Sequence, residues 1–236
     1  MRTWSNGDVS LSQTLTDNDH LYPAHINELR TAFNEGMVSV KDYGAVGDGV
    51  TDDTVAIQTA VDANATVFFP DGTYIISDTI RESTNGGARR LVGNNRLTTI
   101  IKSKSTMTNK PLIWFGNSNG HAVYRGQIEN LYIDGRAVGD GNIGIRLHEA
   151  GLTKISSVYI TNCGIAAQML GTIGCSFNGV TEISTNTKGI VCTSLVHGAP
   201  SSVDDITVTA GGNLVPNINK FESIWLTSMT DSAMEI

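Results

Sequence analysis

The sequence has little that would suit a disulfide-stabilised, membrane-spanning or nucleic-acid-binding protein. Among 236 residues there are three cysteines and five prolines. Cys163, Cys175 and Cys192 have no metal-ligand spacing and stand beside apolar residues, which predicts buried free thiols. No apolar run approaches the about 18–20 residues of a spanning helix. The net charge of -7 disfavours contact with nucleic acid, which requires clustered Lys and Arg.

The first residues also lack an apolar stretch, so the sequence predicts no secretory signal. Residues 1–36 differ in pattern from the rest, because Ile26, Leu29 and Phe33 lie on one face of an expected helix. A single helix of this length needs a partner surface to be stable in water. We therefore expect a small helical appendage over residues 1–36 and a main domain over residues 37–236.

What the main domain has in abundance is glycine, with 25 residues in the chain, and short β-branched runs. Thr, Val and Ile favour strands, whereas Gly, Asn and Asp favour the turns between them. After residue 65 nearly every apolar run is short and is followed by a turn signal. This pattern predicts many short strands at fairly regular spacing, as in an all-β domain.

A repeat runs through the second half of the chain, in which an apolar residue is followed by apolar residues three and five positions later. It recurs about every 23 residues, and a period in the twenties indicates a stacked solenoid. The copies are Ile128/Leu131/Ile133, Ile155/Val158/Ile160, Phe177/Val180/Ile183 (with one extra residue), Val203/Ile206/Val208 and Phe221/Ile224/Leu226. A second repeat opens at Gly144, Gly164 and Gly189. Two or more strands per turn favour a parallel β-helix, while a leucine-rich repeat stays open as the alternative.

The most specific stretch lies at residues 38–80. KDYGAVGDGVTDDTVAIQ predicts a strand, a Gly-rich turn and a helix whose N-cap is Thr51 or Asp52. VFFPDGTYII predicts a strand, an Asp-Gly turn and a second strand. The Gly-rich turn lacks the Gly-Lys-Ser/Thr ending of a P-loop, and Asp48, Asp52 and Asp53 lack the spacing of an EF-hand loop. The sequence therefore predicts neither a nucleotide nor a metal site here, and no cofactor.

KDYGAVGDGVTDDTVAIQTAVD followed by FFPDGTYIIS resembles the start of the pectate-lyase-like right-handed β-helix found in phage tailspikes and related polysaccharide-processing proteins. LVGNNRLTTII, residues 91–101, continues the resemblance as the next rung. The resemblance implies a right-handed parallel β-helix with a short N-terminal capping helix. Tailspikes of this kind generally have more rungs and a C-terminal trimerisation domain. We therefore expect a β-helix that is incomplete at its C-terminal end.

Equivalent positions of successive β-helix rungs stack about 4.8 Å apart. Residues between two core positions point outward, and in this repeat they are Tyr132, Tyr159, Thr181, Thr207 and Trp225. Aromatic faces suit the C–H faces of sugar rings. We expect Tyr132, Tyr159 and Trp225 to bind a polysaccharide, and the alternative is that these rings cover a neighbouring subunit.

A second outward column consists of Glu129, Ser156, Asn178, Asp204 and Glu222. Asp204 and Glu222 on adjacent rungs would suit the two carboxyls of a retaining glycosidase, with mutual repulsion raising the pKa of one. The alternative is that they are only solvated acids. Arg146 and Lys154 are available to a lyase, but no column of basic residues is apparent.

The resemblance and the repeat together predict a phage tailspike or receptor-binding protein of the virion. Such a protein binds, and in its enzymatic form depolymerises, a bacterial surface polysaccharide. Whether the chain is an enzyme, and whether a glycoside hydrolase or a polysaccharide lyase, stays open. One alternative is a structural N-terminal segment of a larger spike or fibre, and another is a cellular pectate-lyase-like polysaccharide lyase.

The expected partners follow from this interpretation. They are the polysaccharide, two further copies of the chain in a homotrimer, and a virion tail or baseplate protein that holds residues 1–36. No nucleic acid and no membrane is expected as a partner. The expected location is the virion, assembled in the host cytoplasm without a signal peptide.

Overall fold

The structure is a computed structural model, and it describes residues 37–82, 88–116, 123–178, 181–184, 186–193, 220–221, 224–227 and 234–235. The chain divides between Glu35 and Gly36 into two units. All described residues belong to the second unit. The helical appendage predicted over residues 1–36 lies outside the described residues and stays a prediction.

Three parallel sheets account for most of the strands. Sheet A contains β1 (Met37–Ser39), β3 (Thr66–Phe69), β6 (Arg90–Gly93), β10 (Gln127–Glu129), β14 (Lys154–Ser156), β17 (Ser176–Asn178) and β20 (Lys220–Phe221). Sheet B contains β2 (Asp48–Asp52), β4 (Gly72–Ile76), β7 (Thr99–Ser103), β11 (Tyr132–Asp134), β15 (Tyr159–Thr161), β18 (Thr181–Ser184) and β21 (Ile224–Thr227). Sheet C contains β5 (Ile80–Glu82), β8 (Pro111–Gly116), β12 (Ile143–His148), β16 (Ile165–Leu170), β19 (Lys188–Thr193) and β22 (Met234–Glu235). Sheet D is the pair β9 (Val123–Tyr124) and β13 (Ala150–Gly151).

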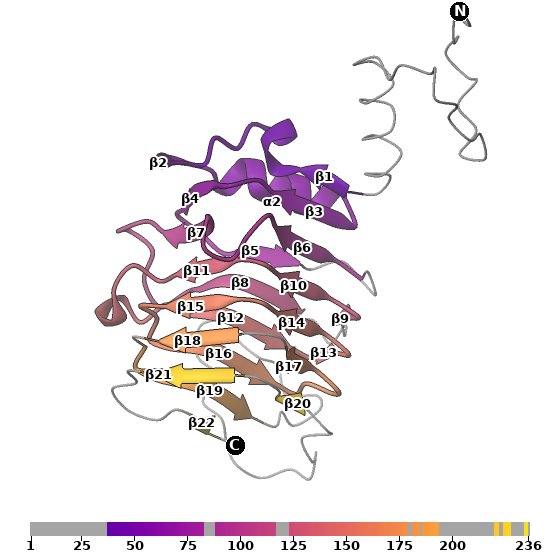
Figure 1. Cartoon of the computed structure of the whole chain (residues 1–236), viewed down its shortest axis with the longest axis vertical. Coiled ribbons are helices and arrows are strands. Elements are labelled where there is room, and N and C mark those ends of the chain that lie inside the picture. Colours follow the sequence, from indigo (N-terminus) through magenta and orange to yellow (C-terminus); the bar gives the residue numbers. More distant parts are fainter. Residues whose placement is uncertain are drawn as a thin grey trace, which may run out of the picture. The chain divides into compact units, whose positions relative to one another are not determined.

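The chain visits sheets A, B and C in turn, and each strand pairs in parallel with the equivalent strand of the next turn. Figure 1 shows the resulting stack, from the first rung in indigo to the last in yellow. This is the right-handed parallel β-helix that the sequence predicted. No helix within the described ranges is long and apolar enough to cross a membrane.

The core is a set of ladders of apolar side chains on the inner faces of the sheets. Ile128 pairs with Ile155 in sheet A, and Ile133 pairs with Ile160 in sheet B. All four are fully buried. Because burial of one such side chain contributes about 1.5–3 kcal/mol, the ladders fix the register of the rungs. These two copies of the predicted repeat are confirmed.

The first rung is capped by helix α2 (Thr54–Ala63). Its N-cap is Asp53, not Thr51 or Asp52 as predicted, and the Asp53 side chain makes no capping hydrogen bond. The Asp52 Oδ1 accepts from the amide of Thr54, the first helical residue, at 3.2 Å. The Asp53 carboxylate instead accepts hydrogen bonds from the amides of Val46 and Gly47, at 2.6 and 3.1 Å. The prediction failed because the Gly-rich turn folds back over the helix start and uses the carboxylate itself.

The Asp71-Gly72 turn joins two sheets and does not close a hairpin. β3 pairs with β6 in sheet A, whereas β4 pairs with β7 in sheet B. A Cβ atom at position 72 would lie 2.7 Å from the carbonyl oxygen of Gly47. Glycine is therefore required at this corner by the close approach of the preceding rung.

The later part of the repeat differs from the prediction. β20 pairs directly with β17, and β21 pairs directly with β18. The rung predicted at Val203, Ile206 and Val208 therefore does not stand between them. Those three residues lie outside the described part of the chain. The apolar pattern identified strand-like residues, but spacing alone does not show which of them join the stack.

Candidate functional site

Two tyrosines of sheet B stack on its outer face. Tyr132 pairs in register with Tyr159, and their ring centroids lie 4.7 Å apart with an interplanar angle of 38°. The Thr161 hydroxyl donates to the Tyr132 hydroxyl oxygen at 3.2 Å, and the hydroxyls of Tyr159 and Ser184 lie 3.1 Å apart. Burial raises the pKa of Tyr132, so its phenol is neutral at ordinary pH. Both rings are partly exposed, and their hydroxyls are held in place.

Register extends this column by two further rungs. Glu182 pairs with Tyr159, and Trp225 pairs with Glu182. Thr181, which the sequence analysis placed in the column, pairs with Ile224 and is one residue out of register. The extra residue in this copy of the repeat lies before the strand, so Ile183 stays in register with Ile160, and Glu182, not Thr181, is in register with Tyr159. Trp225 occupies the predicted position in β21, and its role in binding stays a prediction.

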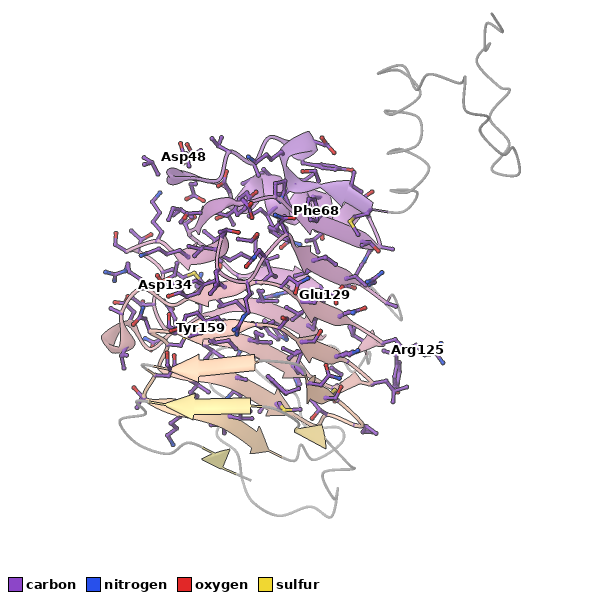
Figure 2. The ribbon with its side chains drawn as sticks, in the orientation of Figure 1. Asp48, Phe68, Arg125, Glu129, Asp134 and Tyr159 are labelled. Atoms are coloured by element: carbon purple, nitrogen blue, oxygen red, sulfur yellow. The ribbon has the colours of Figure 1, made fainter. Side chains whose placement is uncertain are left out.

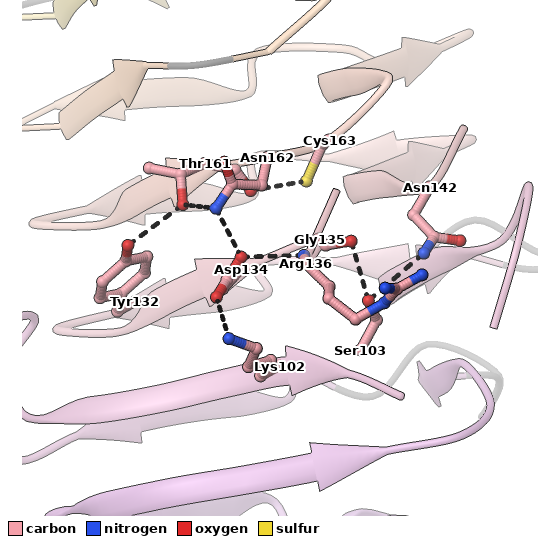
Figure 3. A network of polar contacts seen from close by, with 10 residues as sticks. All are labelled: Lys102, Ser103, Tyr132, Asp134, Gly135, Arg136, Asn142, Thr161, Asn162 and Cys163. Atoms are coloured by element: carbon pink, nitrogen blue, oxygen red, sulfur yellow. Dashed lines mark hydrogen bonds and ion pairs between the residues drawn. The ribbon is translucent and has the colours of Figure 1, made fainter. Parts of the chain in front are cut away.

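Asp134, at the end of β11, binds polar groups from three successive rungs beside the tyrosine column. Its Oδ1 accepts hydrogen bonds from the Arg136 amide and the Asn162 Nδ2, both at 2.8 Å. Its Oδ2 lies 3.0 Å from the Lys102 ammonium. Figure 3 shows these donors converging on one carboxylate from three successive rungs. Asp134 is 7% exposed and both of its carboxylate oxygens are engaged, so it positions the edge of the face.

The sequence analysis did not single out this network. Its signal was a polar residue at the end of each of two equivalent strands, Asp134 and Thr161. Figure 2 shows Asp134 and Tyr159 on the side of β11 and β15, away from Arg125. The structure therefore brings the tyrosines, Asp134 and Lys102 together on one face of sheet B.

The corner that leads from sheet B to sheet C is held by Asn142, which is fully buried. Its Nδ2 donates to the Met107 carbonyl at 2.8 Å and to the Ser103 hydroxyl at 3.3 Å. Ser103 in turn donates to the Gly135 carbonyl at 2.9 Å. These buried hydrogen bonds fix the corner next to Asp134 (Figure 3).

Beside this corner lies a cavity of about 310 Å³. The corner contains the short 3-10 helix η2 (Val138–Asp140), which forms one wall. The lining residues come from three successive rungs and include Val138, Gly141, Gly164, Ile165, Lys188 and Val191. The cavity is mostly apolar with one cationic side chain at its edge, so it suits a ligand with an apolar face.

The catalytic pair predicted from the sequence stays a prediction. The first three members of its column, Glu129, Ser156 and Asn178, are in register as expected. Asp204 and Glu222 lie outside the described residues. The expectation that they occupy adjacent rungs required a rung at residues 203–208. No such rung lies between β17 and β20, because these two strands pair directly with each other.

The acidic residues of the Gly-rich turn have structural roles. Asp48 Oδ1 accepts from the amides of Val50 and Thr51 at 2.8 and 2.7 Å, and the Thr51 amide is the main cause of its lowered pKa. Asp52 Oδ1 accepts from the Thr54 hydroxyl at 2.6 Å. Within the described ranges, no three His, Cys, Asp or Glu side chains gather as a metal site.

Comparison with known proteins agrees with this architecture. Residues 37–121 match the family model described as rhamnogalacturonase A/epimerase, pectate lyase-like. The preneck appendage protein of Bacillus phage PZA is 27% identical over 196 residues, which are 80% of this chain and 19% of the phage protein. The plasmin and fibronectin-binding protein A of Streptococcus pneumoniae is 38% identical over 84 residues, which are 32% of this chain and 12% of that protein. The solved structure of ORF18 from Geobacillus virus E2 has a TM-score of 0.57 and 26% identity, and covers 80% of this chain and 42% of its own.

The chain thus folds as a right-handed parallel β-helix, and its residues 37–121 match the pectate-lyase-like family model, as the sequence resemblance implied. The proteins it resembles include a preneck appendage protein of a Bacillus phage and a protein of Geobacillus virus E2. The chain spans only 12–19% of the length of the two curated relatives.

Proposed function

We propose that this chain is part of a phage virion appendage that binds a bacterial surface polysaccharide through the outer face of sheet B. The observation that carries the proposal is the stacked Tyr132–Tyr159 pair on that face. The phage relatives, which align over 80% of the chain, support a place in the virion.

The tyrosine pair has the properties of a platform for sugar rings. Sugar rings present C–H bonds that pack well on aromatic faces. Both phenols are anchored, one by Thr161 and one by Ser184, so little side-chain freedom remains to be lost on binding. Trp225 lies two rungs further along the same column, and would extend the platform along a polymer that lies parallel to the stack.

Binding is better supported than cleavage in the described residues. Among the carboxylates whose side chains are described, Asp134 lies nearest to the tyrosine pair along sheet B. Its oxygens contact Lys102, Asn162 and the Arg136 amide. A general acid must lie within hydrogen-bond reach of the atom that it protonates, whereas both oxygens of this carboxylate are taken up by contacts within the fold. If the protein cleaves its polysaccharide, Asp204 and Glu222 are the residues proposed to do so. Residues 1–36 are the segment proposed to attach the chain to the virion.

Binding is tested with capsular and O-antigen polysaccharides purified from the bacteria that the phage infects. Titration calorimetry compares the wild type with Tyr132→Ala and Tyr159→Ala. The control is Tyr124→Ala, because Tyr124 is 49% exposed and lies in sheet D. We expect each sheet B variant to bind about tenfold more weakly, which is about 1.4 kcal/mol. Equal affinity of the Tyr132 and Tyr124 variants, or no polysaccharide bound by the wild type, contradicts the proposal.

Cleavage and assembly are tested separately. New reducing ends indicate a hydrolase and an ultraviolet-absorbing unsaturated product indicates a lyase, and either is expected to disappear in Asp204→Asn or Glu222→Gln. Light scattering is expected to give the mass of three 25.2 kDa chains. Binding without any product would leave the protein as an adhesin. A monomeric mass would contradict the trimer.

A further inference from the structure

A directional chain of hydrogen bonds on sheet B ends at the hydroxyl of Tyr132 (Figure 3). The Asn162 Nδ2 donates to the Asp134 Oδ1 at 2.8 Å and to the Thr161 Oγ1 at 3.3 Å. The Thr161 hydroxyl in turn donates to the Tyr132 hydroxyl oxygen at 3.2 Å. A phenol has a single hydrogen. Because Tyr132 accepts from Thr161, its own hydrogen is not used in this chain and is available to a ligand.

The charged end of the chain of hydrogen bonds fixes its direction. Asp134 can only accept, because its Oδ2 forms an ion pair with the Lys102 ammonium at 3.0 Å. Asn162 therefore donates to it, and the order of donors and acceptors follows from there to Tyr132. Burial raises the pKa of Tyr132, so its phenol keeps the proton. Each hydrogen bond in such a chain polarises the next one, which strengthens the terminal phenol as a donor.

The neighbouring rung adds a second donor. The hydroxyls of Tyr159 and Ser184 lie 3.1 Å apart, and either of them can donate to the other. Two hydroxyl groups have two hydrogens, and this contact uses one of them. The second hydrogen is therefore available to a ligand whichever group donates. The described part of the face presents a hydrogen at each of two successive rungs.

An apolar side chain lies beside the Tyr132 donor. Ile100 pairs in register with Tyr132 on the adjacent strand β7. Its neighbours Thr99 and Ile101 are fully buried, whereas Ile100 is partly exposed and faces outward. The outer column therefore runs from Ile100 through Tyr132 to Tyr159. A group that packs on Ile100 while it accepts from Tyr132 must combine an apolar end with a hydrogen-bond acceptor.

The acetyl group of an acetamido sugar has this combination. Its carbonyl oxygen accepts hydrogen bonds and carries no hydrogen that would need an acceptor of its own. A sugar hydroxyl does carry one, and the nearby oxygens of Asp134 and Thr161 already have partners. A ligand carboxylate would lie beside Asp134, and Lys102 balances only one negative charge there. The acetyl methyl group would pack on Ile100, and burial of a group of this size strengthens binding roughly fourfold.

We propose that the Tyr132 hydroxyl donates to the acetyl carbonyl of an acetamido sugar whose methyl group packs on Ile100. The inference rests on the proposed function, because it names the class of sugar that the face of sheet B selects. Tyr132 then has two separate roles. Its ring supports any sugar with a C–H face, and its hydroxyl adds a preference for acetylated sugars.

The test compares tetra-N-acetylchitotetraose with cellotetraose, which has the same backbone and linkage but a hydroxyl in place of each acetamido group. Titration calorimetry is expected to give about tenfold tighter binding of the acetylated form, from one hydrogen bond and one buried methyl group. Tyr132→Phe keeps the ring and removes the hydroxyl, so it should leave cellotetraose binding unchanged and remove most of the preference. The matched control is Tyr124→Phe in sheet D, at a tyrosine that is 49% exposed, and it should leave the preference intact.

Ile100→Thr removes the apolar contact of the methyl group and is expected to lower the preference about threefold. Equal binding of the two tetrasaccharides, no binding of either at millimolar concentration, or an unchanged preference in Tyr132→Phe or Ile100→Thr would each overturn the inference. Equal weakening of both tetrasaccharides in Tyr132→Phe would assign the hydroxyl to the platform alone and would also overturn it. Failure of the proposed function is distinguished by Tyr132→Ala with capsular and O-antigen polysaccharides, because that variant removes the ring as well.

Discussion

Replacement of Asp134 by alanine tests whether the face of sheet B is held by a single carboxylate. The substitution removes the acceptor of two partly buried donors, the Arg136 amide and the Asn162 Nδ2. The Asn162 Nδ2 keeps a longer contact with the Thr161 hydroxyl oxygen at 3.3 Å. Each orphaned donor costs about 1–3 kcal/mol. The Lys102 side chain is 38% exposed and can return to water, so its ion pair contributes at most about 1 kcal/mol.

Because both donors are only partly buried, we expect Asp134→Ala to lower the free energy of unfolding by about 2 kcal/mol. For a protein of this size about 1 kcal/mol corresponds to roughly 2–4 °C in melting temperature, so the expected decrease is roughly 4–8 °C. Thermal unfolding followed by circular dichroism measures it. The matched variant is Lys102→Ala, which removes the exposed partner alone and is expected to lower the melting temperature by less than about 4 °C. Equal shifts for the two variants would refute the reasoning, because they would show that the Arg136 and Asn162 donors find other acceptors.

Three further predictions concern individual residues. Leu152 has a φ of 54° and is 55% exposed, so Leu152→Gly should relieve left-handed backbone strain and raise the free energy of unfolding in urea by about 0.5–1 kcal/mol; no gain would contradict this. Burial raises the pKa of the Cys163 and Cys175 thiols, so in a Cys192→Ser background both should react with a thiol reagent only after unfolding, and rapid reaction of the native protein would count against the burial. Burial lowers the pKa of His148, which predicts an NMR titration midpoint below the usual 6.5. As pH falls through 6.5 the unfolded chain is protonated first, so native stability is full above that pH and declines below it; a midpoint above 6.5 would reverse the sign.

The stacked fold could be predicted because it depends on the local spacing of apolar residues in the sequence. Ile128, Leu131 and Ile133 repeat at a fixed spacing, and each is buried as expected. The strand, Asp71-Gly72 turn and strand were predicted correctly, but the same turn residues serve a hairpin and a corner between two sheets. What distinguishes the two is the partner of each strand, and that partner lies more than twenty residues away.

The same limit applies to the site. Tyr132 and Tyr159 could be paired from the sequence because they hold the same position in two regular copies of the repeat. The Lys102–Asp134 ion pair could not, because Lys102 lies before the first copy of the repeat and no repeat aligns it with Asp134. Thr181 was misplaced by a single inserted residue, which shows how strongly an outward column depends on register.

The corner between sheets B and C differs in length from one rung to the next. Residues 135–142 connect β11 to β12, whereas residues 162–164 connect β15 to β16. The strands on either side nevertheless stay aligned, with Asp134 opposite Thr161 and Ile143 opposite Ile165. Insertions and deletions at this corner are therefore absorbed locally and leave the inner ladders undisturbed. A change of length between Arg136 and Gly141 would therefore alter the outer surface of the protein, while the hydrogen bonds of Asn142 and the inner ladders keep their places.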